Sequence, residues 1–92
     1  MTNTERAYAA GLFDGEGCVH RDNRGTLSVI IANDNRNVLE WVEDRWDGNV
    51  FEVRPGHFQW RANSNDAEFF LVDIIDHLIV KFDPALEAVN DN

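Results

Sequence analysis

The stretch Ala10-Gly11-Leu12-Phe13-Asp14-Gly15-Glu16-Gly17 lies between a helical segment and a strand-like one. Upstream of it, the pattern predicts a helix over residues 4–14, with Thr2 and Glu5 placed to form a capping box and the glycines ending the helix. Small residues fall on one side of this helix, and with Asp14 they make up the set Ala7, Ala10, Gly11 and Asp14. Because small residues let two backbones approach closely, this side predicts a helix–helix contact.

Two predicted β-hairpins supply the sheet. The first joins residues 18–21 to residues 26–32 through Asp22-Asn23-Arg24-Gly25, which has turn composition. The second joins residues 50–54 to residues 57–63 through Pro55-Gly56. Apolar and polar residues alternate along these strands, so we expect a sheet covered by helices on one side only.

Further helices are expected after each hairpin. Asn33-Asp34-Asn35 offers N-caps for a helix with apolar spacing that ends at Asp47-Gly48. Asn65 and Glu68 form a second capping box that opens an amphipathic helix, and Asp83-Pro84 begins a short last helix over residues 85–89. The expected fold is therefore a single α+β domain over residues 1–92, in the order αββαββα plus a short C-terminal helix, with a four-stranded antiparallel sheet.

Composition narrows the function. The chain has 92 residues, 43% of them apolar, which is enough for one small core. A single cysteine, no zinc-type spacing, no signal peptide and no membrane-spanning stretch favour a cytoplasmic protein. The net charge of −9 opposes nucleic-acid binding, because DNA-binding proteins are expected to be basic.

The stretch at residues 10–17 resembles the motif that names the LAGLIDADG homing endonucleases. Identical letters stand at Ala10, Gly11, Leu12, Asp14 and Gly17, and similar residue types stand at Phe13, Gly15 and Glu16, while Ala9 replaces a preferred Leu. A second segment, residues 77–85, is similar to the late segment of the family, in which a Leu-rich helix end precedes a lysine, here Lys81. The two motifs occur in the order of the family.

The resemblance implies a metal-dependent active site. Glu16 of each subunit would bind Mg²⁺ or Mn²⁺, Gly15 would lend a backbone carbonyl, and Lys81 and Asn35 would lie nearby as polar catalytic residues. Physical reasoning agrees, because two helices packed through small faces bring two negative C-termini and two carboxylates together, which calls for a cation. Hard oxygen ligands beside a phosphate select Mg²⁺ or Mn²⁺.

The resemblance also implies a homodimer that cuts double-stranded DNA. One motif per chain supplies one acid, so two chains joined through Ala7, Ala10, Gly11 and Asp14 would cut the two strands of a roughly palindromic site. The polar sheet face would enter the major groove. Its expected DNA-binding residues are His20, Thr26, Ser28, Arg54, Gln59, Arg61 and Asn63, with Glu52 on the same face by strand parity. A gene carried by a phage or an intron would fit this role.

Other interpretations of the same residues remain open. Asp14 and Glu16 would serve only to cap a helix end, Lys81 would be an ordinary exposed lysine, and His57 would have no ligand role. Cys18 is expected to be a small buried residue, and Asp73 and Asp76 to lie on a solvated helix face. The alternative function is a catalytically decayed dimeric module that binds a protein or a small ligand or imitates DNA, and a plain dimerisation module is a third.

Overall fold

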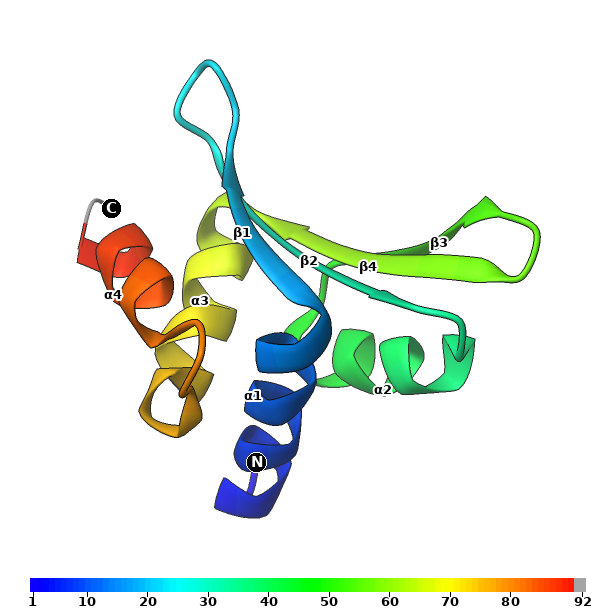
Figure 1. Ribbon diagram of the computed structural model, residues 1–92, viewed down its shortest axis with the longest axis horizontal. Helices are drawn as coiled ribbons and strands as arrows, with labels where there is room; N and C mark the ends of the chain where they lie inside the picture. Colours follow the sequence, from blue (N-terminus) through cyan, green and yellow to red (C-terminus); the bar gives the residue numbers. More distant parts are fainter. Residues whose placement is uncertain (91–92) are drawn as a thin grey trace.

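The computed structural model describes residues 1–90 and confirms the predicted α+β class, with helices on one face of a four-stranded antiparallel sheet (Figure 1). The elements are α1 (Asn3–Glu16), β1 (Gly17–Arg21), β2 (Leu27–Asn33), α2 (Arg36–Trp46), β3 (Asn49–Arg54), β4 (His57–Asn63), α3 (Ser64–Ile74), the 3-10 turn η1 (Ile75–His77) and α4 (Phe82–Asn90). The order αββαββα followed by a short last helix is as predicted. Over residues 1–90, no helix has the length and apolar character needed to cross a membrane.

Helix α1 begins at the predicted capping box and ends later than predicted. The Thr2 hydroxyl accepts the Glu5 backbone N–H at 3.1 Å, and the Glu5 carboxylate accepts the Thr2 N–H at 3.0 Å. The helix continues through Gly15 to Glu16, and its last turn closes when the Gly17 N–H donates to the Phe13 carbonyl. Glu16 is therefore the last helical residue, directly before β1.

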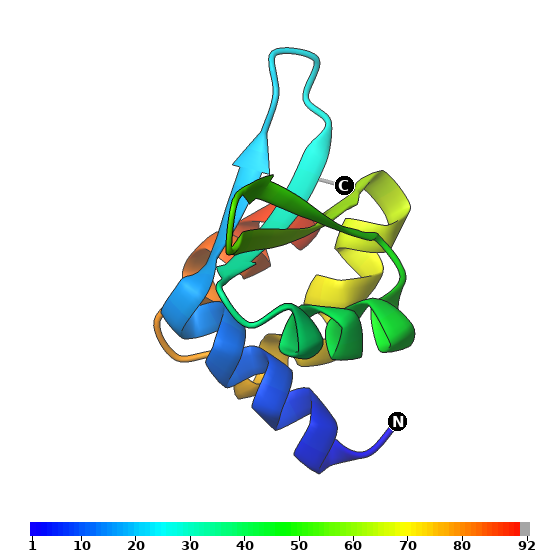
Figure 2. The same cartoon turned by 90° about the vertical axis from the view of Figure 1, so that its right-hand side faces the viewer.

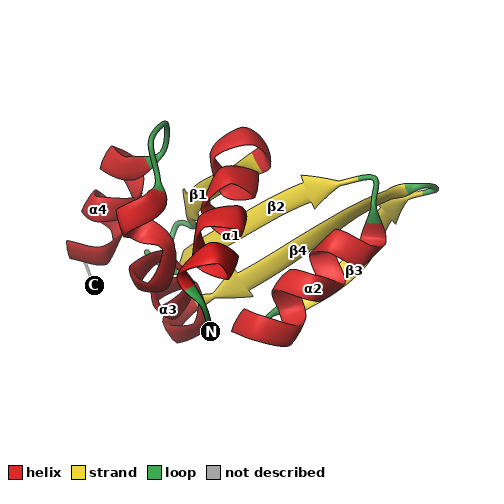
Figure 3. Cartoon of the chain, turned by 90° about the horizontal axis from the view of Figure 1, so that it is seen from below, coloured by secondary structure: helices red, strands yellow, loops and turns green. Residues whose placement is uncertain are grey.

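The strands lie in the order β1-β2-β4-β3, so the two hairpins meet through β2 and β4. Ile31 pairs with Trp60 and Val29 with Ala62 across this central seam. These side chains face the helices and are fully buried or nearly so. Figure 3 shows α1, α2, α3 and α4 on the same side of the sheet, which leaves the other side open.

Aromatic side chains fill the core between the sheet and the helices. The Phe70 ring of α3 lies 5.5 Å from Phe13, 5.3 Å from Trp46 and 4.8 Å from Trp60, measured between ring centroids. Each such buried side chain contributes roughly 1.5–3 kcal/mol through loss of apolar surface to water. In Figure 2 the strands lie above α1 and α2.

Two helix starts differ from the sequence prediction. Helix α3 begins at Ser64, one residue before Asn65, and its N-cap Asn63 makes no side-chain capping bond to the helix. The Asn63 amide oxygen instead accepts the Ser28 hydroxyl at 2.7 Å. Helix α4 begins at Phe82, because the Ala85 N–H bonds the Lys81 carbonyl and adds a turn before Pro84.

Two burial predictions were wrong. Asp73 is not on a solvated face, because its carboxylate accepts Arg6 Nε at 2.8 Å and Trp46 Nε1 at 2.8 Å between the helices. Cys18 is exposed, because Gly17 and Val19 face the helices and strand alternation turns Cys18 to the open side. For Asp73 the partners that decide burial come from distant parts of the chain, whereas for Cys18 the alternation of β1 decides it.

Candidate functional site

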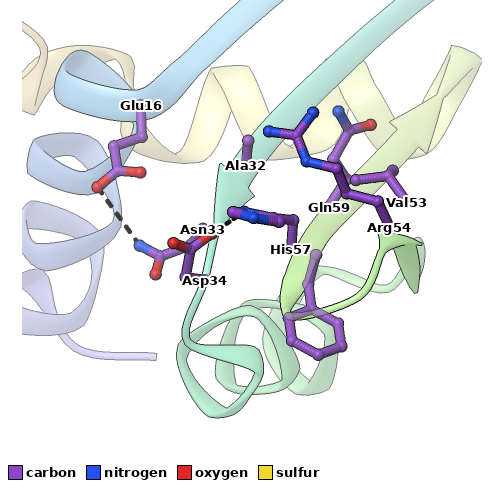
Figure 4. Close-up of a pocket in the computed structure, with 9 residues that line it drawn as sticks. Glu16, Ala32, Asn33, Asp34, Val53, Arg54, His57 and Gln59 are labelled. Carbon is purple, nitrogen blue, oxygen red and sulfur yellow. Dashed lines mark hydrogen bonds and ion pairs between the residues drawn. The ribbon is translucent and has the colours of Figure 1, made fainter.

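Glu16 lies at the mouth of a polar pocket on the open side of the molecule. The pocket has a volume of about 400 Å³ and is lined by Glu16, Ala32, Asn33, Asp34, Val53, Arg54, His57, Phe58 and Gln59. The Asn33 amide donates to Glu16 Oε1 at 3.4 Å. Figure 4 shows Glu16 at one end of the pocket and Arg54 and Gln59 towards the other. A carboxylate, an amide and a guanidinium thus share one concave surface.

His57 is a pocket residue that sequence reasoning missed. Its Nδ1 lies 2.6 Å from the Asp34 carboxylate, and the two residues come from the start of β4 and the loop after β2. Nothing in their sequence spacing indicates this contact, because it exists only when β2 and β4 pair in the observed register. A carboxylate on one ring nitrogen orients the imidazole, which leaves Nε2 as the nitrogen available to other groups.

The two predicted polar catalytic neighbours lie close to the site but make structural contacts. Asn35 caps α2, where its side-chain oxygen accepts the Val38 N–H at 3.3 Å, and the residue beside Glu16 is Asn33. Lys81 Nζ donates to the Asp14 carbonyl at 2.6 Å. A lysine there satisfies an unpaired carbonyl at the helix end and complements the negative C-terminus of α1.

Asp14 links the end of α1 to the loop before α4 by hydrogen bonds. Its carboxylate accepts the backbone N–H groups of Ile79 at 2.8 Å and Lys81 at 2.9 Å. Burial raises the pKa of Asp14, but the backbone hydrogen bonds from Ile79, Lys81 and Val80 outweigh it, so the pKa lies below its usual value. Asp14 therefore holds the Lys81 segment against the helix end that carries Glu16.

In the structure, part of the predicted small-residue side of α1 is buried in the core and part of it is exposed. Ala10 has no exposed surface and packs with Ala9 and Phe13 in the chain's own core, so it is corrected from interface to core residue. Ala7 and Gly11 remain exposed, and a Cβ built on Gly11 meets no atom within 4 Å. A narrower strip of small residues is therefore open on α1.

The open face of the sheet is the predicted DNA surface, and strand pairing defines it. The residues that point away from the helices are Cys18, His20, Ser28, Ile30, Ala32, Asn49, Phe51, Gln59, Arg61 and Asn63. Glu52 is corrected to the helical side, because it pairs with Phe58 in the register that sets Val50 against the buried Trp60. Arg54 lies beyond an irregularity in β3 and lines the Glu16 pocket, while Thr26 lies just before β2.

Charge is divided between the two sides of the molecule. None of those outward strand positions holds an acid, although the chain has seventeen. The described acids occupy helices, turns and the helical side of β3. Arg61, in contrast, lies on the open face, and its buried Nε has no hydrogen-bond partner within residues 1–90. The net charge of −9 therefore does not describe this surface.

One chain alone supplies few ligands for a cation. Among residues 1–90, no group of three or more His, Cys, Asp or Glu side chains is arranged to hold a metal ion. Glu16, the last residue of α1, places its carboxylate beside the Asn33 amide, and Gly15, the other predicted donor, precedes it in the chain. Mg²⁺ takes one or two carboxylates together with water and substrate phosphates, so this donor set suits Mg²⁺ only when other partners complete it.

Comparison with solved structures identifies the fold. The chain superposes on the homing endonuclease I-CvuI, crystallised with its target in the presence of Ca²⁺, with a TM-score of 0.82 at 15% identity, covering 95% of this chain and 64% of that one. The archaeal intron-encoded homing endonuclease I-Vdi141I, complexed with DNA, gives 0.74 at 20% identity, covering 96% and 66%. The LAGLIDADG meganuclease I-AabMI, bound to uncleaved DNA, gives 0.63 at 23%, covering 95% and 38%.

The chain therefore has the LAGLIDADG homing endonuclease fold, as its two motifs predicted. It spans 64% of the length of I-CvuI. By sequence, it matches no protein-family model and no curated protein.

Proposed function

We propose that this chain is one subunit of a homodimeric, site-specific DNA endonuclease that uses Mg²⁺ or Mn²⁺. The observation that carries the proposal is the place of Glu16, which ends the helix with the open small-residue strip and borders a sheet face without acids. A carboxylate there would meet a second carboxylate across a two-fold axis, and both would face the DNA held by the sheet. The structural neighbours bound to DNA support this assignment.

The dimer would form through α1 and the loop that Asp14 holds. Ala7 and Gly11 offer close backbone approach, and Ile79 and Val80, which are 85% and 72% exposed, extend the same end of the molecule with apolar surface. A second chain that covers these two apolar side chains would remove their surface from water, and this burial would stabilise the dimer. Asp14 itself is committed to its own chain and would position this loop instead of contacting the partner directly.

Glu16 and the Gly15 carbonyl would hold the metal, with the partner's residues and DNA phosphates as further donors. When bound, Mg²⁺ would supply a Lewis acid and a more acidic bound water for phosphodiester hydrolysis. Asn33 orients the Glu16 carboxylate through its 3.4 Å contact. Lys81 anchors the end of α1 and places positive charge two residues from Glu16.

The open sheet face would lie in the major groove as a β-ribbon. Arg61 supports this placement, because it stands at an outward position of β4 between Ile30 and Asn49, where its guanidinium would meet base edges or phosphates. Gln59 and Arg54 extend the same surface towards the Glu16 pocket. With few cations on this face, few phosphates would be neutralised, so base contacts must provide much of the affinity.

The test is cleavage of a library of duplex targets with Mg²⁺ or Mn²⁺ by the native protein and by Glu16→Gln. The substitution keeps the shape of the side chain and removes the charge that a divalent ion requires. Strand cleavage is expected to fall more than about 100-fold, because even outer residues around a metal are worth 10–100-fold. Dimerisation and DNA binding should persist in the variant.

The second candidate is a dimeric binding module of the same fold without catalysis. The apolar residues Phe51 and Val53 on the open side and the acidic helical layer favour it. If the native protein cuts no member of the library with either ion, and its melting temperature does not respond to Mg²⁺, the nuclease proposal fails and this module is the better description.

A further inference from the structure

The middle of the open sheet face carries methyl-bearing and aromatic side chains between polar ones. Ile30 and Ala32 on β2 and Phe51 on β3 point outward there, and Val53 reaches the Glu16 pocket. Phe51 is 39% exposed and Val53 47% exposed, so neither belongs to the core beneath the sheet. A strongly phosphate-binding surface would place cations at such positions. Their apolar character therefore needs a different partner group.

Strand register sets these side chains directly beside the polar readers. Gln59 on β4 pairs with Ala32 on one side and with Phe51 on the other. In the next outward row, Arg61 has Ile30 on one side. Neighbouring strands lie about 4.8 Å apart, so each polar head group has an apolar neighbour within the width of one base pair.

In the major groove, only thymine presents a methyl group. Glutamine pairs with adenine through N6 and N7, and alanine and phenylalanine pack on the thymine C5 methyl. The row made of Ala32, Gln59 and Phe51 holds both kinds of reader for an A·T pair. No acid occupies the outward strand positions beside it, which suits a polyanion and disfavours a basic protein partner.

We propose that this row reads A·T base pairs, with Gln59 on adenine and Ala32 or Phe51 on the thymine methyl, and that Ile30 and Val53 extend the methyl contacts. The substrate class is thus duplex DNA whose half-sites carry thymine where the β2, β3 and β4 strands meet it. This inference rests on the proposed DNA-binding function. It explains how a subunit with few free cations on its DNA face obtains affinity and specificity from base edges.

The experiment removes thymine methyl groups without changing base pairing. A randomised duplex pool is selected on the native protein with Ca²⁺ in place of Mg²⁺, so that bound duplexes are not cut, and the enriched duplex is synthesised once with thymine and once with uracil. The thymine duplex should bind about fourfold more tightly for each methyl contacted, and about sixteenfold when both half-sites of a dimer contribute one. Phe51→Asn should abolish most of this thymine-over-uracil ratio.

Phe69→Asn is the matched control, because Phe69 is an exposed phenylalanine on α3, away from the sheet face. It should leave the thymine-over-uracil ratio of the native protein unchanged. Equal binding of the thymine and uracil duplexes would overturn the thymine-methyl inference and leave DNA binding itself intact. Failure of the pool to enrich any duplex would instead overturn the proposed function, and this inference with it.

Discussion

The open face of the sheet and the helical layer beneath it use side chains in opposite ways. On the helical side, acids are frequent and several hold the fold together: Asp73 joins Arg6 to Trp46, and Glu5 joins Thr2 to Arg45. On the open side, the outward strand positions hold no acid, and Arg61 has an unpartnered Nε among the described residues. The charge of the open sheet face therefore differs from what the net charge of −9 would suggest.

The strip of small residues around Gly11 differs from the acidic remainder of the helical layer, because we expect it to contact a second chain. Gly11→Leu should convert the proposed dimer to a monomer at micromolar concentration, because the added side chain would separate two helices that need close contact. The monomer should stay folded, because a Cβ at Gly11 meets nothing within 4 Å and leucine favours helix over glycine. Light scattering reports the mass and circular dichroism the fold.

Gly11→Ala provides a graded control, with a smaller loss of dimer than the leucine variant. A native protein that is monomeric in the same light-scattering experiment would contradict the pairing through α1.

A substitution at Arg61 tests whether DNA affinity depends on the charge of the open face or on the net charge of the chain. Arg61→Ala should lower DNA affinity about tenfold or more, because one base-reading arginine is worth about 1–3 kcal/mol. Glu87→Gln also changes the net charge by one unit, but from α4 on the helical side, and should leave the affinity within about twofold. Fluorescence anisotropy on a selected duplex measures both. Because Arg61→Ala removes a positive charge and Glu87→Gln removes a negative one, a gain of affinity from Glu87→Gln as large as the loss from Arg61→Ala would show that net charge controls binding.

Asp73 tests the structural use of acids on the helical side. Asp73→Asn weakens its contacts to Arg6 and Trp46, so unfolding by urea should require about 1–2 kcal/mol less free energy. This is less than the roughly 3–5 kcal/mol for a fully buried pair, because the Arg6 and Asp73 side chains keep 29% and 19% of their exposure. Asp76→Asn, at an exposed residue of η1, should change little.

The smallest expected effect is at Glu5. Hydrogen bonding from the Thr2 backbone, then from the Arg45 side chain, lowers the pKa of Glu5 from 4.5 to about 2. The folded state thus prefers the ionised form, so this stabilisation is complete above pH 4.5 and is lost as the pH falls towards about 2. Glu5→Gln should flatten the pH dependence of the melting temperature in this window. An unchanged acid limb would show that Glu5 is not its source.

Local signals in the sequence predicted the elements well. The Thr2–Glu5 capping box, the turn at residues 22–25 and the strand alternation each depend on residues a few positions apart, and each appears in the structure. The capping box predicted at Asn65 and Glu68 failed, because a residue from a distant strand competes for the neighbouring position: Asn63 bonds Ser28 and the helix begins at Ser64.

The candidate site was only partly predictable. The motif at residues 10–17 located Glu16, because the helix end and its carboxylate are local features. His57 with Asp34, and Asn33 as the neighbour of Glu16, came only with the pairing of β2 and β4. The side of the sheet on which Glu52 lies was also decided by strand pairing. The register of β3 on β4 places Glu52 on the helical side, and an irregularity follows before Arg54.

By itself, the sequence determined the kind of each element, the order αββαββα and the carboxylate at the end of α1, because helix caps, turn residues and hydrophobic periodicity act over a few residues. Tertiary structure alone decided that Ala10 is core, that Asp14 latches the loop before Lys81, and that acids avoid the open sheet face. Those outcomes depend on strand register and helix packing, which bring together residues tens of positions apart and leave no local pattern in the chain.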